Sequence, residues 1–367
     1  MSDLLLIAPA ASRRGALMQA ALAKAGRKPA MVLDYQTLLL RPELLAEYLA
    51  AHPQAFIKLE SPGESPPLEA TLIAHGWQLA GCPGAPPAPL QHGELGWRRF
   101  WYQGFAALLH ALEKAVSGMR PNWVNPPAEV LAMGDKLACR MRLAAAGIRQ
   151  PEGLGVAELQ GFDDLVARSR ATGIDRVFVK ARYGSSAAGV VACRFHRDGR
   201  LQLESATRLL DGRLVNCLTP QRLSDVSAVR ALIDALCREA AYAERWLPKP
   251  RAGDCGQFDV RLVMLGGEPR QRLARISKGA LTNLHLGNRR AEVAQLLGDG
   301  QIRQLEQTGR QVAQALAPSQ LMGIDVIVGK NHADVLEVNA FGDLLLGVAH
   351  DGRLTHQDQA ELFGLAA

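Results

Sequence analysis

The chain has 367 residues, of which 48% are hydrophobic and 21% are charged, and its formal net charge is +6. This length is too great for one compact core, so two or three lobes are expected, and no apolar run reaches the roughly 18 residues that indicate a membrane span. The positive charge favours anionic ligands such as nucleotides or acidic peptides, whereas the aromatic content of 5% and the lack of a dense Lys/Arg block argue against a nucleic-acid partner.

Six cysteines are spread along the chain with no Cys-x-x-Cys pair. This spacing favours reduced thiols over disulfides or a zinc site. The first apolar run is short, and its basic residues follow it rather than precede it, which is unlike a secretory signal. We therefore expect a cytoplasmic protein that makes no contact with a membrane.

The first 120 residues predict a small parallel sheet. An Ala/Leu-rich helix at 12–25 lies between short apolar strands at 4–8 and 30–34. This β-α-β order is typical of a parallel sheet, but no Gly-x-Gly-x-x-Gly motif follows the first strand, so a dinucleotide fingerprint is absent. The remaining elements expected in this Rossmann-like α/β lobe are a strand at 56–60, a proline-rich irregular stretch at 82–90 and a helix within 93–116.

Two lysines occupy positions from which they can contact phosphate groups. Lys136 follows Asp135 near the start of a helix that runs to Gly147. Lys180 ends a strand that leads into the small-residue loop 184–189, GSSAAG, and then into a second strand. Backbone N–H groups of such a loop can approach phosphates while a lysine supplies charge, although the Walker A pattern is absent. The alternatives are a solvated surface lysine and a plain β-hairpin.

The next segment alternates strands with polar loops. Asp259 and Arg261 share one face of a strand at 257–265, because successive side chains of a strand point to opposite faces. The other elements expected here are helices at 225–240 and 301–315, strands at 242–247 and 271–276, a polar loop at 277–290 and a capping helix in the tail after residue 349.

The stretch 322–339, MGIDVIVGKNHADVLEVN, predicts two strands joined by a turn. Glu337 and Asn339 point to the same side, and we assume a register in which Asp325 pairs with Glu337. Two carboxylates and an amide oxygen on an apolar hairpin suit Mg²⁺, because buried carboxylates are costly unless they are paired or bind metal. The alternative is an ordinary hairpin whose acids face solvent.

The order of these motifs resembles the ATP-grasp superfamily. The order is Asp-Lys, a lysine strand with a Gly/Ser loop, Asp-x-Arg, Asn-Leu-His-x-Gly and finally Asp…Glu-x-Asn, and it is most similar to the ribosomal-protein-S6-modifying glutamate ligase (RimK-like) branch. The resemblance covers about residues 125–343. It implies an α/β fold in which two α+β subdomains, 121–246 and 247–348, clamp ATP after the first lobe (1–120), with a tail helix at 349–367.

The resemblance also implies roles for individual residues at the metal and phosphate sites. Asp325, Glu337 and Asn339 match the ligands of two Mg²⁺ ions, with Glu337 bridging the ions and Mn²⁺ as an alternative metal. Lys136 and Lys180 match lysines that contact ATP phosphates. The residues that match the loop covering the triphosphate are Gly184, Ser185, Ser186 and Gly189.

Further matches concern the base, the ribose and the reacting phosphate. The segment between subdomains, whose backbone contacts the adenine edge, corresponds to Glu244, Arg245, Trp246 and Leu247. Asp259 matches an acid near the ribose, with Arg261 as its basic partner. Arg275 matches an arginine that contacts the γ-phosphate or the acyl phosphate, so Arg275 and Lys180 are the implied catalytic residues. Asn283 matches the asparagine of an Arg-Ser-Asn-Leu-His loop.

One position departs from the pattern of that branch. Leu281 stands where the branch has arginine, which puts the corresponding phosphate or substrate contact in doubt. Arg289 and Arg290 lie a few residues later and are candidates to compensate. The base that would take the amine's proton is not assigned; His285 is the only nearby candidate, and we favour a structural or phosphate-contact role for it.

The resemblance implies an ATP-dependent carboxylate–amine ligase that forms an amide through an acyl phosphate and releases ADP and phosphate. The substrates would be a small molecule or peptide with a carboxylate, together with an amine, and the oligomeric state stays open. Two alternatives remain: a phosphotransferase of the same fold that acts on a hydroxyl group, and a non-catalytic ATP-binding protein.

Overall fold

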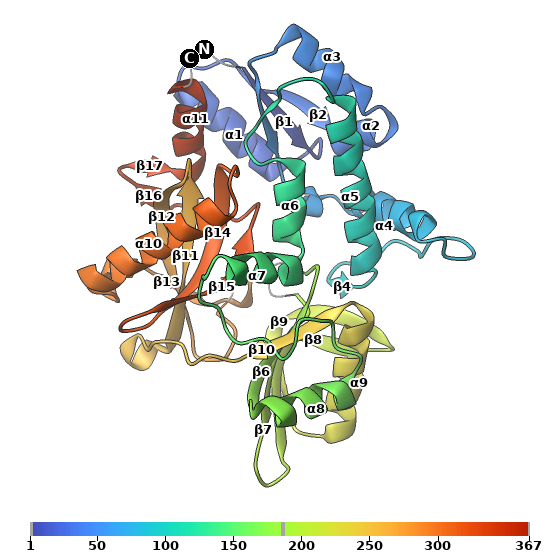
Figure 1. Cartoon of the computed structure of the whole chain (residues 1–367), viewed down its shortest axis with the longest axis vertical. Helices are drawn as coiled ribbons and strands as arrows, with labels where there is room; N and C mark the ends of the chain where they lie inside the picture. The colour runs from blue at the N-terminus through green and yellow to red at the C-terminus, as the bar shows by residue number, and fades with distance from the viewer. Residues whose placement is uncertain (1–2, 185–187, 283, 366–367) are drawn as a thin grey trace.

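The computed structural model describes residues 3–184, 188–282 and 284–365. Figure 1 shows three parts: a first lobe at the top, a C-terminal subdomain at the left and a central subdomain at the bottom. Each part is built on its own sheet, of four, five and six strands respectively. Among the described residues, no helix is long and apolar enough to cross a membrane.

The first lobe contains the predicted parallel sheet, in the strand order β2-β1-β3-β5. All five residues of β1 are buried, and the Ser12 side chain caps the following helix by accepting a hydrogen bond from the Gly15 N–H. The strands are β1 (Leu4–Ala8), β2 (Met31–Asp34), β3 (Phe56–Leu59) and β5 (Asn122–Trp123). The helices are α1 (Arg13–Lys24), α2 (Tyr35–Leu40), α3 (Glu43–Ala51), α4 (Pro66–Leu79) and α5 (Arg98–Ala115).

The central subdomain is an antiparallel sheet, in the order β10-β6-β7-β8-β9-β4, whose core packs against two helices. Its last strand, β4 (Glu94–Leu95), comes from the first lobe's part of the sequence, while β5 joins the first lobe from beyond residue 120. The other strands are β6 (Arg176–Ala181), β7 (Val190–Phe195), β8 (Leu201–Leu210), β9 (Arg213–Leu223) and β10 (Ala241–Arg245). The helices are α8 (Phe162–Thr172) and α9 (Val226–Arg238).

The C-terminal subdomain is a five-stranded antiparallel sheet, in the order β13-β12-β11-β14-β15. One face packs on α10, α6 and α7, and one end of the opposite face packs on β1 and α1 of the first lobe. The strands are β11 (Gln257–Leu265), β12 (Glu268–Ser277), β13 (Arg289–Ala291), β14 (Leu321–Val328) and β15 (Ala333–Asn339). The helices are α6 (Pro127–Gly134), α7 (Lys136–Ala145), α10 (Asp299–Ala315) and the tail helix α11 (Thr355–Leu365), which follows the small hairpin of β16 (Ala349–His350) and β17 (Arg353–Leu354).

A buried network of charges joins the first lobe, the tail helix and the loop that follows β15. Arg14 lies 2.5 Å from one oxygen of Asp343, and Lys58 contacts both Glu60 and Asp343. Gln359 of α11 donates to the other Asp343 oxygen at 2.9 Å. Burial by itself would raise the pKa of Asp343, but the neighbouring cations hold it well below its usual range. The network therefore fixes the loop after β15 against the first lobe.

We expect His356, beside this network, to make the protein less stable in mild acid. Burial lowers the pKa of His356 to about 4 from its ordinary 6.5, with Asp343 opposing the shift. Between these two pH values the unfolded chain binds a proton that the native chain does not, so the free energy of unfolding falls as pH falls, by about 3 kcal/mol in all.

Urea titrations at pH 7 and pH 4.5 measure this change. His356→Gln should remove most of the loss, whereas His332→Gln, at a half-exposed histidine, should keep the wild-type profile. Identical pH profiles for wild type and His356→Gln would contradict the assignment.

Candidate active site

The candidate site lies on the face of the C-terminal sheet that is turned toward the central subdomain. Asp325 is directly opposite Glu337 on β15 and directly opposite Arg261 on β11, which confirms the register assumed from the sequence. Directly opposite residues of an antiparallel pair share a face, and on β12 Arg275 is likewise opposite Asp259. One face therefore carries three acids and two arginines from four strands.

The two arginines hold Asp325 ionised in a buried position. Arg261 binds it through two hydrogen bonds, and the Arg275 NH2 lies 3.1 Å from its Oδ2. Arg275 also donates from Nε to Asp259 at 2.8 Å. Burial raises the pKa of Asp325, but the Arg261 and Arg275 guanidinium groups outweigh this and lower it overall. Arg261 thus contacts the acid at 325, whereas the resemblance had paired it with Asp259.

Lys249, which sequence reasoning missed, is the second basic partner of Asp259. Its Nζ lies 3.0 Å from the carboxylate and 2.6 Å from the Thr282 Oγ1. Burial lowers the pKa of Lys249, and Asp259 only partly offsets this. The only signal in the sequence is that this lysine stands between two prolines, just after the segment that joins the two subdomains.

On the central subdomain, Lys180 forms an ion pair with a fully buried carboxylate, Glu244. The two charged groups are 2.5 Å apart, and Arg140 of α7 contacts the other Glu244 oxygen at 2.7 Å. Arg140 also lies over the Tyr242 ring. Sequence reasoning missed Arg140, since an arginine on a helix surface gives no signal of its own. The structure therefore assigns the Glu244 side chain a role in holding Lys180.

In the segment between the subdomains, two of the three backbone N–H groups at 245–247 already donate hydrogen bonds within the protein. The Arg245 N–H donates to the Glu152 carbonyl at 2.7 Å, and the Trp246 N–H donates to the Arg176 carbonyl at 2.9 Å. Among the described residues, no hydrogen-bond acceptor is found for the Leu247 N–H. Of these three donors, only Leu247 is therefore free to meet a ligand.

Lys136 links β15 to the base of the Gly/Ser loop. Its Nζ lies 3.4 Å from the Glu337 Oε1 and donates to the Gly184 carbonyl. Only 9% of Lys136 is exposed, so the alternative of a solvated surface lysine does not hold. At the far end of the loop, Gly189 has a φ of +70°, and a Cβ there would lie 2.8 Å from the Ala181 Cβ.

Three predicted residues cannot be placed. Ser185, Ser186 and Asn283 lie outside the described residues, and the same is true of the His285 side chain. Their roles stay predictions from the resemblance.

The donor set at Asp325, Glu337 and Asn339 fits a hard divalent cation. Its ligand atoms are carboxylate and amide oxygens on one sheet face, which are the ligands that Mg²⁺ prefers. The buried Asn339 Nδ2 has no hydrogen-bond partner among the described residues. No hydrogen bond from this nitrogen within the protein therefore explains why an amide side chain stands here. Among the described residues, no group of three or more His, Cys, Asp or Glu side chains is placed to hold a metal ion.

Leu281, where the resembling branch has arginine, is buried in an apolar cluster. Its neighbours there include Phe178 of β6 and Trp246. Arg289 and Arg290 are exposed on the edge strand β13, and Arg290 is directly opposite Arg275. Arg290 therefore lies on the same face as the site, and its NH1 donates to the Leu346 carbonyl at 2.7 Å.

We expect Leu281→Arg to destabilise the protein rather than restore an anion contact. A guanidinium group without a partner in this cluster should lower the free energy of unfolding by about 3 kcal/mol. Leu218→Arg is the control, because Leu218 is 75% exposed and its replacement should change stability by less than about 0.5 kcal/mol. Urea unfolding compares the two, and equal stabilities would contradict the buried position of Leu281.

Taken together, the sheets and the site define the chain as a protein with the fold of the ATP-grasp ligases. The chain aligns with the ATP-grasp ligase PsnB complexed with a minimal precursor at a TM-score of 0.54 and 15% identity, over 100% of both chains. It aligns with D-cycloserine synthetase DcsG at 0.56 and 13%, over 99% of this chain and 100% of that chain. A D-alanine–D-alanine ligase from Bacillus anthracis complexed with ATP gives 0.51 and 12%, over 93% and 86%.

Another PsnB structure, with a TM-score of 0.55 and 15% identity over 99% of this chain and 98% of that chain, contains Mg and ADP. No protein-family model and no curated protein sequence matches the chain. At these identities the likeness establishes the fold, and it confirms the predicted arrangement of a parallel-sheet lobe followed by two α+β subdomains, whose sheets are antiparallel.

Proposed function

We propose that this protein is an ATP-dependent carboxylate–amine ligase that forms an amide and releases ADP and phosphate. The observation that supports this most is a cluster of ion-paired residues between the two subdomains, which we call the basic cluster. Its six cations outnumber its four carboxylates by two, so it favours an anionic ligand. Its members are Lys136, Arg140, Lys180, Lys249, Arg261, Arg275, Glu244, Asp259, Asp325 and Glu337.

The position of the basic cluster suits a nucleoside triphosphate. The Leu247 N–H has no acceptor among the described residues and would contact the adenine edge, while Lys136 and Lys180 would contact the phosphates. Mg²⁺ would be held by Asp325, Glu337 and Asn339, and two ions there would neutralise charge on the β- and γ-phosphates. Mn²⁺, with the same preference for oxygen ligands, is a plausible substitute.

The chemistry proceeds in two displacements. A substrate carboxylate oxygen attacks the γ-phosphorus, and the bond to the β-phosphate oxygen breaks, which gives an acyl phosphate and ADP. An amine nitrogen then attacks the acyl carbon, the C–O bond to phosphate breaks, and the amine loses a proton to the medium. Arg275 and Lys180 would stabilise the charge on the transferred phosphoryl group, because fixed cations in a water-poor site need little reorganisation.

No nucleophilic side chain is required, since positioning and charge stabilisation carry both steps. The carboxylate substrate is a peptide or a small molecule. PsnB, which shares the fold, was solved with a precursor peptide, and DcsG is a synthetase of the small molecule D-cycloserine. Both kinds of substrate are therefore included in the test.

The test is ADP and free phosphate release with Mg²⁺, against pooled amino acids and acidic peptides, with and without hydroxylamine. Hydroxylamine converts an acyl phosphate into a hydroxamate, so phosphate release together with hydroxamate would support the proposal. ADP without free phosphate would favour a phosphotransferase. Tight Mg-ATP binding with no turnover in any pool would favour a binding protein and would contradict the ligase proposal.

A further inference from the structure

The residues Arg182, Tyr183 and Gly184, which we call the loop stem, join β6 to the Gly/Ser loop and hold Lys136 from two sides. The Arg182 carbonyl accepts the Lys136 backbone N–H at 3.2 Å, and the Gly184 carbonyl accepts its Nζ. The backbone and the side-chain end of this lysine therefore both depend on where the loop stem lies.

The first lobe contacts the loop stem through a pair of stacked rings. Tyr102 of α5 stacks on Tyr183, with ring centroids 4.3 Å apart and an interplanar angle of 22°. The Tyr102 hydroxyl donates to the Leu131 carbonyl at 3.0 Å, which fixes the ring from its other end. A stacked pair contributes about 0.5–1.5 kcal/mol beyond the area that it buries.

A chain of ion pairs also connects α5 to the loop stem, in addition to the stacked rings. Arg182 binds both oxygens of Asp135, the residue that caps α7 before Lys136, at 2.7 and 2.5 Å. It also contacts Glu158 at 2.7 Å, and the other Glu158 oxygen lies 2.6 Å from Arg99 of α5. The guanidinium of Arg182 is thus held by two carboxylates, and the second of these is shared with the first lobe.

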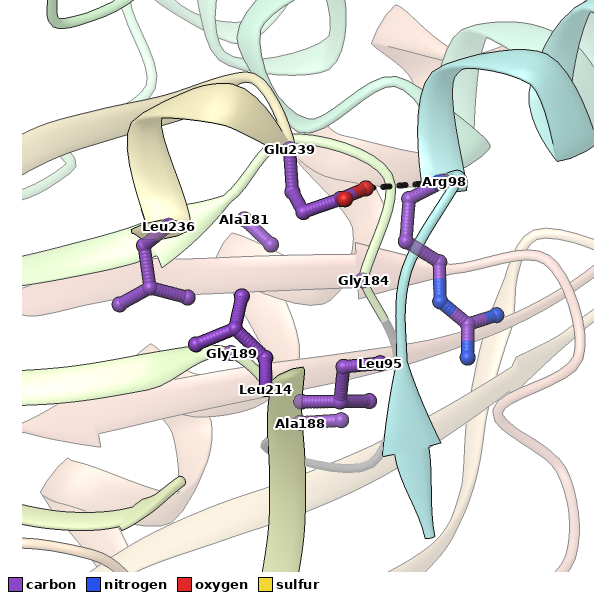
Figure 2. A pocket seen from close by; sticks show the side chains of 9 residues that line it. All are labelled: Leu95, Arg98, Ala181, Gly184, Ala188, Gly189, Leu214, Leu236 and Glu239. Carbon is purple, nitrogen blue, oxygen red and sulfur yellow. Dashed lines mark hydrogen bonds between the residues drawn. The ribbon is translucent and has the colours of Figure 1, made fainter. Parts of the chain in front are cut away.

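The start of α5 is in turn attached to the central subdomain. Figure 2 shows Glu239, at the end of α9, accepting a hydrogen bond from the Arg98 backbone N–H, and the distance is 2.9 Å. Beside it, β4 pairs with β9, and Leu95, Ala181 and Gly189 line a small cavity. These contacts fix α5 against both the sheet and the loop stem.

We propose that Tyr102 is a positioning residue for Lys136, so that α5 of the first lobe sets the affinity of the site for the nucleotide's phosphates. Tyr102 acts through the Tyr183 ring and the loop stem, and it touches no nucleotide itself. The choice of ligand rests on the proposed function, whereas the contacts that transmit the effect are independent of it.

The first experiment compares Mg-ATP and adenosine binding by calorimetry in two Tyr102 variants and one control. Tyr102→Leu should weaken Mg-ATP binding about 3- to 10-fold and leave adenosine binding unchanged, while Tyr102→Phe, which keeps the ring, should stay within about 2-fold of wild type. Tyr48→Leu removes another stacked ring of the first lobe, which packs on His52 at 4.5 Å, and should leave both affinities unchanged. Equal losses in Tyr48→Leu and Tyr102→Leu would overturn the proposal.

The second experiment tests whether the effect passes through Lys136. In a Lys136→Met background, Tyr102→Leu should cause no further loss of Mg-ATP affinity, because the lysine that it positions is gone. Additive losses in the double variant would overturn the proposal.

Amide hydrogen exchange of the nucleotide-free protein separates this inference from the proposed function. Exchange at 134–139 should be faster in Tyr102→Leu than in Tyr102→Phe or Tyr48→Leu, and unchanged exchange would overturn the positioning role. A wild-type protein that does not bind Mg-ATP would instead contradict the proposed function, and the exchange result would still decide whether Tyr102 holds this segment.

Discussion

Glu337→Gln is expected to lower ADP formation by about 100-fold or more while the protein stays folded. The change keeps the size of the side chain but removes the negative charge directly opposite Asp325. It therefore weakens the oxygen site beside Asn339 and takes away the anionic partner of Lys136, which lies 3.4 Å away. Loss of one such charge in a preorganised site costs about 10²–10³ in rate.

The control is a glutamate of the same subdomain with similar exposure. Glu306 forms an ion pair with Arg272, and its side chain is 27% exposed, against 21% for Glu337. Glu306→Gln should leave ADP formation within about 2-fold of wild type, since surface ion pairs contribute little. A Glu337→Gln variant that keeps full activity would remove the basis for the metal assignment.

Lys180→Met is expected to reduce ADP formation by about 100- to 1000-fold, because it removes a cation from the place assigned to the phosphates. It should also lower the free energy of unfolding by about 2 kcal/mol. The reason is that Glu244 is fully buried and, among the described residues, would keep Arg140 as its only ion-pair partner.

A second substitution separates these two effects. In the double variant Lys180→Met with Glu244→Gln, the buried charge is gone, so thermal unfolding should return toward the wild-type temperature while ADP formation stays low. Recovery of activity together with stability would show that Lys180 serves only to neutralise Glu244. Persisting inactivity in a stable double variant would support the phosphate role.

The local pattern of the sequence was enough to predict the β-α-β lobe and the hairpin at 322–339. Both follow from neighbouring residues: a strand of buried apolar residues at 4–8, and alternating side chains at 322–339 whose period fixes which acids share a face. The structure confirms the parallel pairing of β1 and β2 and the pairing of Asp325 with Glu337.

Other features needed contacts between residues far apart in the sequence. Glu244 pairs with Arg140 and Lys180, which are 104 and 64 positions away, and the residues next to Glu244 in the sequence do not indicate these partners. The strand β4 likewise leaves the first lobe's part of the chain to join the central sheet. A half-buried strand of two residues is too short to show a pattern of its own, and its pairing with β9 defines it.

The sequence by itself determined which oxygens and cations this protein carries and on which side of each strand they lie, because the period of a strand is a local property. Only the tertiary structure decided which charges neutralise one another. Lys249 and Arg275 both form ion pairs with Asp259, while Arg261 forms one with Asp325. The physical reason is that a buried charge must find a partner wherever the packed elements bring one within reach, and sequence distance does not limit that choice.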